Sequence, residues 1–78
     1  MTHQEMENGR RAVARDVRNE LKTIMEKEKL TSEIEIRVLN KYLNKFKSLM
    51  TDEQLAKRYP VTFLAYSARL IDKEMNNG

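Results

Sequence analysis

Four basic side chains fall in one row along a predicted first helix. Their spacing of four, three and four residues places them on one side of an α-helix; they are Arg11, Arg15, Arg18 and Lys22. Guanidinium groups form paired hydrogen bonds with phosphates and carboxylates. The row is therefore a candidate contact surface for a nucleic-acid backbone or an acidic partner. The alternative is a solvated helix face, because Asp16, Glu20 and Glu26 lie on the same helix.

A second basic row, Arg37, Lys41 and Lys45, lies away from the apolar stripe of the next predicted helix. Lysines in such a position are typical of a solvated face. No exposed aromatic residue is interleaved with them to indicate stacking on single-stranded bases. This row alone does not define a binding site.

The side chains needed for catalysis are missing or isolated. The single histidine, His3, lies near the N-terminus without predicted rigid neighbours, which a general base requires. With no cysteine and no second histidine, a zinc site of ordinary composition cannot be built. The two glycines form no phosphate-binding loop. The sequence predicts a protein that is not an enzyme and needs no cofactor or metal.

Length and charge set further bounds. Seventy-eight residues with 40% hydrophobic and 35% charged side chains predict one folded domain, 1–78. The longest nearly apolar run, 61–66, is far shorter than the ~20 residues that cross a bilayer, so we expect no membrane insertion. The polar start MTHQEMENG and the absence of cysteine favour a cytoplasmic protein. The net charge of +3 is too small to indicate a nucleic-acid partner by itself.

Apolar residues recur every three or four positions, which predicts an all-α fold. The apolar stripe of the first helix is Val13, Val17, Leu21 and Ile24, and that of the second is Val38, Leu39, Tyr42, Leu43, Phe46, Leu49 and Met50. We expect a compact bundle of three to four helices, possibly dimeric in solution, over 8–28, 33–50, 52–58 and 60–75. Gly9 disfavours helix, so residues 1–7 are expected to form a loose tail. If the tail is helical instead, Thr2 and Glu5 have the spacing of a capping box.

Other local signals mark where the remaining helices begin and end. Ser32 with Glu35, and Thr51 with Gln54, both have capping-box spacing. Pro60 fits the first turn of a helix, where its missing amide hydrogen has no cost. Asn76, Asn77 and Gly78 predict a helix stop.

The last predicted helix has an apolar sector that covers about half of its circumference, because Phe63 and Leu70 widen its apolar stripe. The stripe consists of Val61, Leu64, Ala68, Ile71 and Met75. A sector of this width predicts burial on two sides, either between neighbouring helices or against a second copy of the chain. Its candidate protein-interface residues are Phe63, Tyr66 and Leu70.

Residues 53–70, EQLAKRYPVTFLAYSARL, have the rhythm of a helix-turn-helix. The turn of that motif ordinarily needs glycine, whereas Pro60 fixes φ near −65°. The second helix should open with polar side chains that read base edges, but it offers Phe63, Leu64 and Ala65. We therefore expect a helix-proline-helix corner packed in the core, without DNA reading.

The second half of the sequence resembles a known family of small proteins. Residues 37–75, RVLNKYLNKFKSLMTDEQLAKRYPVTFLAYSARLIDKEM, contain the segments NKYLNKF and KRYPVTF. In these segments and in its composition this half resembles the small cytoplasmic rapid-lysis accessory proteins of T-even bacteriophages. The resemblance implies a protein that binds the cytoplasmic part of a holin or antiholin and helps to delay host lysis.

The residues themselves favour a non-catalytic helical module that regulates by binding another protein and associates with itself. The alternative is a DNA- or RNA-binding regulator that uses the basic row of the first helix. Nucleic-acid binding through that row would fall steeply with salt and would be lost on changing Arg15 and Arg18 to glutamate.

Overall fold

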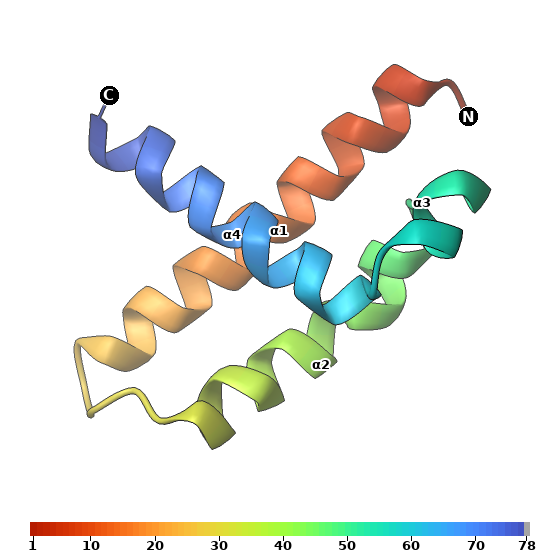
Figure 1. Ribbon diagram of the computed structural model, residues 1–78. Helices are drawn as coiled ribbons and strands as arrows, with labels where there is room; N and C mark the ends of the chain where they lie inside the picture. The colour runs from red at the N-terminus through yellow and green to blue at the C-terminus, as the bar shows by residue number, and fades with distance from the viewer. Residues whose placement is uncertain (78) are drawn as a thin grey trace.

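The computed structural model describes residues 1–77, which fold into four α-helices without a strand (Figure 1). They are α1 (His3–Met25), α2 (Ser32–Ser48), α3 (Asp52–Lys57) and α4 (Pro60–Asn77). The predicted all-α bundle is therefore confirmed.

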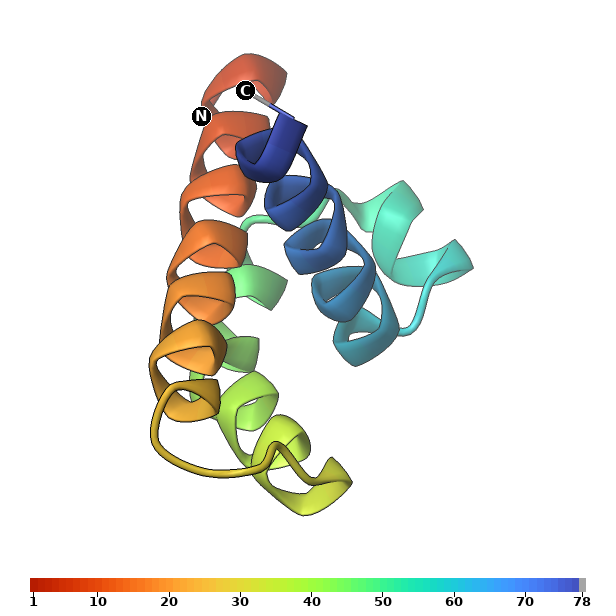
Figure 2. The ribbon, with the colours of Figure 1, turned by 90° about the vertical axis from the view of Figure 1, so that its left-hand side faces the viewer.

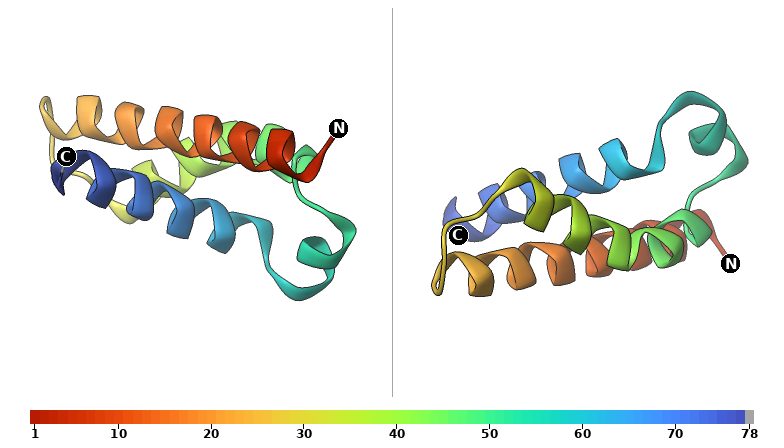
Figure 3. Two further views of the ribbon diagram at one scale, coloured as in Figure 1. Left: turned by 90° about the horizontal axis from the view of Figure 1, so that it is seen from above. Right: turned by 90° about the horizontal axis from the view of Figure 1, so that it is seen from below.

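Three long helices form the bundle. Helices α1 and α2 make a hairpin joined by the loop 26–31, and α4 crosses α1 while it also packs on α2 (Figures 1 and 2). Because α4 packs on two neighbours within the chain, its wide apolar sector is largely accounted for without a second copy. Helix α3 stands away from the three long helices at one end of the molecule (Figure 3).

The core forms where the three apolar stripes meet. Phe46 of α2 is fully buried, and its ring meets the ring of Phe63 edge-on, with the ring centroids 5.3 Å apart. The buried apolar side chains of the described residues are Val13, Ala14, Val17, Val38, Leu39, Phe46, Met50, Leu64, Ala68 and Ile71. The expected stripes of the first two long helices thus face inward. In the last one Met75 was wrongly included, because its side chain is 47% exposed.

Helix α1 begins at His3, so the prediction of a loose tail over residues 1–7 and a start near Asn8 was wrong. The Thr2 hydroxyl accepts a hydrogen bond from the Glu5 amide, and the Glu5 carboxylate accepts one from the Thr2 amide. This capping box stabilises the first turn. Gly9 does not interrupt the helix. The absence of a side chain at this position lets Leu49 pack closely against the backbone of α1. A Cβ at this position would lie 3.0 Å from Cδ1 of Leu49.

The hairpin between α1 and α2 differs from expectation at both of its ends. Helix α1 ends at Met25, three residues before the predicted end. The N-cap of α2 is Thr31, whose hydroxyl accepts a hydrogen bond from the Ile34 amide at 3.2 Å. The predicted capping box of Ser32 and Glu35 was therefore wrong by one residue. The structure ends α2 at Ser48, two residues before the predicted end.

The start of α3 and the start of α4 were predicted correctly, but the packing of α3 was not. Thr51 and Gln54 form the predicted capping box, and Pro60 opens α4 as predicted. However, α3 buries none of its side chains, and Tyr59 in the corner is 82% exposed. The prediction that this helix-proline-helix corner packs in the core was therefore wrong. The exposed α3 also lacks the packing between two helices that a helix-turn-helix needs. Helix α4 continues to Asn77, two residues past the predicted end, and the expected stop at Gly78 lies outside the described residues.

Candidate functional site

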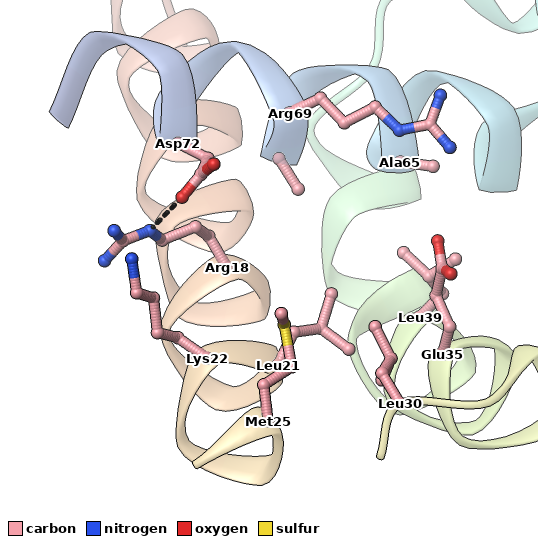
Figure 4. A pocket seen from close by; sticks show the side chains of 11 residues that line it. Arg18, Leu21, Lys22, Met25, Leu30, Glu35, Leu39, Ala65, Arg69 and Asp72 are labelled. Atoms are coloured by element: carbon pink, nitrogen blue, oxygen red, sulfur yellow. Dashed lines mark hydrogen bonds and ion pairs between the residues drawn. The ribbon is translucent and has the colours of Figure 1, made fainter. Parts of the chain in front are cut away.

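A groove with an apolar floor opens between α1, α2 and α4 (Figure 4). Its volume is ≈ 360 Å³. The apolar side chains that line it are Leu21, Met25, Leu30, Leu39, Ala65 and Ala68. Helix α4 contributes the small side chains of Ala65 and Ala68 to the groove, which lies at the loop end of the α1–α2 hairpin. Concave apolar surfaces of this size are the usual setting of ligand or peptide sites.

Charged side chains surround this floor. Lys22 of α1 and Arg69 of α4 are both exposed at its rim, and Glu35 of α2 lies on the other side. Arg18 donates a hydrogen bond from Nε to Oδ1 of Asp72 at 2.9 Å, which ties α1 to α4 (Figure 4). The Arg18 side chain is only 14% exposed, so this cation is largely held inside the rim. The rim therefore offers an approaching group more positive than negative charge.

The predicted basic row of the first helix lies along the α1–α4 contact. Arg11 forms an ion pair with Glu74, and Arg18 forms one with Asp72. Arg15 is exposed and lies close enough to Glu74 to contribute to its electrostatic environment. Lys22 reaches the groove. Two of the four cations are thus engaged by carboxylates of the same chain, and a phosphate-binding role for the row stays a prediction.

The Arg11–Glu74 ion pair shifts the pKa of both groups away from their ordinary values. The hydrogen bond from Arg11 lowers the pKa of Glu74, and the same bond raises the pKa of Arg11. Both side chains are well exposed, at 44% and 54%, so this pair contributes little to stability.

A second polar cluster joins α1 to α2 at Glu20. Its Oε1 accepts hydrogen bonds from Nζ of Lys41 at 2.9 Å and from the hydroxyl of Tyr42 at 2.8 Å. The hydrogen bond from Lys41 and then that from Tyr42 lower the pKa of Glu20. The hydrogen bond to Glu20 and burial raise the pKa of Tyr42. One residue of the second basic row is thus engaged in holding the hairpin together.

This cluster predicts how stability changes in acid. Because the pKa of Glu20 is lower in the folded than in the unfolded chain, its contribution is present above the ordinary value of 4.5 and is lost as the pH falls through the folded-state pKa. We expect the free energy of unfolding to decrease below about pH 5. Glu20→Gln should flatten that decrease, as measured by urea unfolding between pH 3 and pH 7.

The matched control is Glu28→Gln, which changes an exposed carboxylate in the loop between α1 and α2. It should leave the acid slope of the wild-type protein in place. An acid slope that Glu20→Gln does not change would show that the cluster has no such role.

The predicted interface residues of α4 differ in how far they are exposed. Phe63 is half-buried against Phe46, so most of its ring belongs to the core. Tyr66 is 52% exposed and Leu70 is 41% exposed, so both remain open to a partner. Self-association through them stays a prediction.

Sequence reasoning missed most of the groove. Lys22 and Arg18 were selected for their charge, but Met25 and Leu30 were not considered, and Ala65 was considered only as a residue unable to read bases. The available signal was the pair of alanines at 65 and 68 within a helix of otherwise large apolar residues. Small residues spaced by three positions leave room beside a helix, and this indicates either close packing or an opening.

Residues 1–77 contain no group of three histidine, cysteine, aspartate or glutamate side chains placed to hold a metal ion. None of the helices in that part of the chain is long and apolar enough to cross a membrane.

Fold and surface together define a small all-α bundle with an apolar groove whose charged rim has more cations than carboxylates. No protein-family model, curated protein or solved structure matches the chain.

Proposed function

We propose that the protein is a non-catalytic interaction module that binds an amphipathic helix of a partner protein in the groove between α1, α2 and α4. The observation that carries this proposal is the combination of an apolar floor with the exposed cations Lys22 and Arg69 at its rim. A helix that lays an apolar ridge into a groove is a common mode of protein recognition.

The groove also favours particular chemistry in its occupant. Met25 is 59% exposed beside the floor, and the flexible methionine side chain can adapt to different apolar partners. The cations at the rim would meet acidic side chains on the flanks of a bound helix. The expected partner segment therefore has apolar residues at helical spacing with glutamate or aspartate beside them.

The resemblance of residues 37–75 to the rapid-lysis accessory proteins of T-even bacteriophages adds a candidate partner. It implies a cytoplasmic segment of a holin or antiholin, whose capture would help to delay lysis without any reaction catalysed by this chain. We therefore include that segment among the partners proposed for the groove.

The test uses two synthetic 18-residue amphipathic helices with the same leucine ridge, one flanked by glutamates and the other by lysines. We expect the acidic peptide to bind more tightly, with backbone NMR shifts concentrated at the groove. The double variant Lys22→Glu/Arg69→Glu should reverse the preference between the two peptides, because it reverses the charge of the rim.

The control is Arg37→Glu/Lys45→Glu, which makes the same change of charge on the outer row of α2. It should leave the preference for the acidic peptide in place. Equal binding of both peptides by the wild-type protein, or shifts located away from the groove, would contradict the proposal.

A further inference from the structure

A second surface lies where α3 meets α4, away from the floor of the groove. Its side chains line a shallow pocket of ≈ 400 Å³; they are Lys57, Arg58, Tyr59, Thr62, Phe63 and Tyr66. We call it the tyrosine corner. Tyr59 is 82% exposed and Tyr66 is 52% exposed, so neither ring is required to fill the core.

Phe63 anchors this corner to the bundle. Its ring packs edge-on against the buried Phe46, and the guanidinium of Arg58 lies 4.6 Å from the centroid of the Phe63 ring. A guanidinium held against an aromatic face loses part of its freedom before any ligand arrives. The corner therefore presents a cation, held against Phe63, in the same pocket as the two exposed tyrosines.

The charge of the corner is positive. Among the described residues, its lining includes the cations Lys57 and Arg58 and no carboxylate. The first turn of α4 also carries no acidic residue. Lys57 forms an ion pair with Glu53, but both side chains are more than 70% exposed, so an anion can compete for the lysine.

We propose that the tyrosine corner binds single-stranded nucleic acid, with bases stacked on Tyr59 and Tyr66 and phosphates on Arg58 and Lys57. Exposed rings interleaved with cations are the combination that holds single strands with little sequence preference. The two tyrosines are seven positions apart. Tyr59 directly precedes α4 and Tyr66 lies within it, so at 1.5 Å per residue they are roughly 10 Å apart along the helix axis and can contact different nucleotides.

A duplex is a poorer fit to the same surface. Its bases are stacked on one another and cannot reach the tyrosine rings. The first turn of α4 offers Val61, Thr62 and Phe63 to a groove, with little capacity to read base edges. The proposed ligand is therefore a strand with unpaired bases.

The experiment is fluorescence anisotropy of a labelled 12-nucleotide oligo(dT), compared with a 12-base-pair duplex. We expect the single strand to bind more tightly. Tyr59→Ala/Tyr66→Ala should weaken binding about 100-fold, since each stacked base contributes roughly tenfold. Tyr59→Phe/Tyr66→Phe keeps both rings and should bind within about twofold of the wild-type protein.

A charge variant separates this corner from the basic row of α1. Arg58→Ala should weaken binding and reduce the salt dependence by about one phosphate contact, whereas Arg15→Ala should leave both unchanged. Equal affinity for the duplex, or no loss in the alanine pair, would overturn the proposal.

Photocrosslinking of the wild-type protein to 5-bromouracil-containing oligo(dT) provides a measurement that does not depend on how any variant folds. Crosslinks at Tyr59 or Tyr66 are expected. Crosslinks confined to α1 would overturn the proposal, as would the absence of any crosslink.

Discussion

Replacing Phe46 with alanine is expected to reduce the free energy of unfolding by about 3 to 5 kcal/mol. Phe46 is fully buried, and it is the largest of the fully buried side chains. Its removal leaves a cavity where α2 meets α4 and takes away the surface against which the Phe63 ring packs. A domain of 78 residues has a total stability of about 4 to 12 kcal/mol, so this loss is a large fraction of the total free energy of unfolding.

Urea unfolding followed by circular dichroism at 222 nm measures this loss. If Phe46→Ala does not fold at all, Phe46→Leu provides the intermediate step, with a smaller loss because less volume is removed. The exposed Tyr59→Ala serves as the control and should change stability by less than about 0.5 kcal/mol. A loss below about 1 kcal/mol for Phe46→Ala would contradict the described core.

Two leucines of α4 give the second large effect. Leu64 is fully buried, whereas Leu70 is 41% exposed on the same helix. Leu64→Ala is expected to cost about 2 to 5 kcal/mol, because the cavity forms between α4 and the hairpin. Leu70→Ala removes the same atoms and keeps the same helix propensity, but it should cost less than about 1 kcal/mol.

This pair of variants tests which face of α4 is buried, since helix propensity cancels in the comparison. The difference in the midpoint of urea unfolding is the quantity to measure. Equal losses for the two leucines would mean that α4 buries both sides, as it would if a second copy of the chain covered Leu70.

Much of the fold could be predicted from residue spacing. The stripes built on Val13 and Val17 and on Val38 and Phe46 have the helical period, and these four side chains are buried, while others of the same stripes are partly buried at the edge of the core. The capping box at Thr51 and the proline at position 60 located α3 and the start of α4. These features succeed because each depends on contacts within a few residues of the chain.

The errors arise where a distant segment decides the outcome. Gly9 disfavours helix locally, but Leu49 occupies the space that a side chain would take. The spacing of apolar residues cannot show that Leu55 lies outside the core. Its side chain is 37% exposed because no other helix covers α3. Ala14, which received no attention in the sequence, is fully buried since α4 crosses α1 there.

The candidate site was less predictable than the fold. The charge of Arg18 is visible in the sequence, but its carboxylate partner Asp72 is 54 residues away. The groove depends on where α4 crosses α1, which is set by packing in three dimensions. The tyrosine corner was only partly predicted: Tyr66 was expected at an interface, but the segment around Pro60 was expected to pack in the core, whereas Tyr59 is 82% exposed.

Helix α3 is the segment of this chain in which substitutions and changes of length should be tolerated best. It contributes no side chain to the core, and its ends are set by a threonine cap on one side and a proline on the other. Segments with these properties accept altered length and sequence far more readily than the helices they connect. The bundle can therefore keep its shape while the connection between α2 and α4 diverges. In this chain, recognition could evolve at the tyrosine corner independently of the packing that holds the three long helices together.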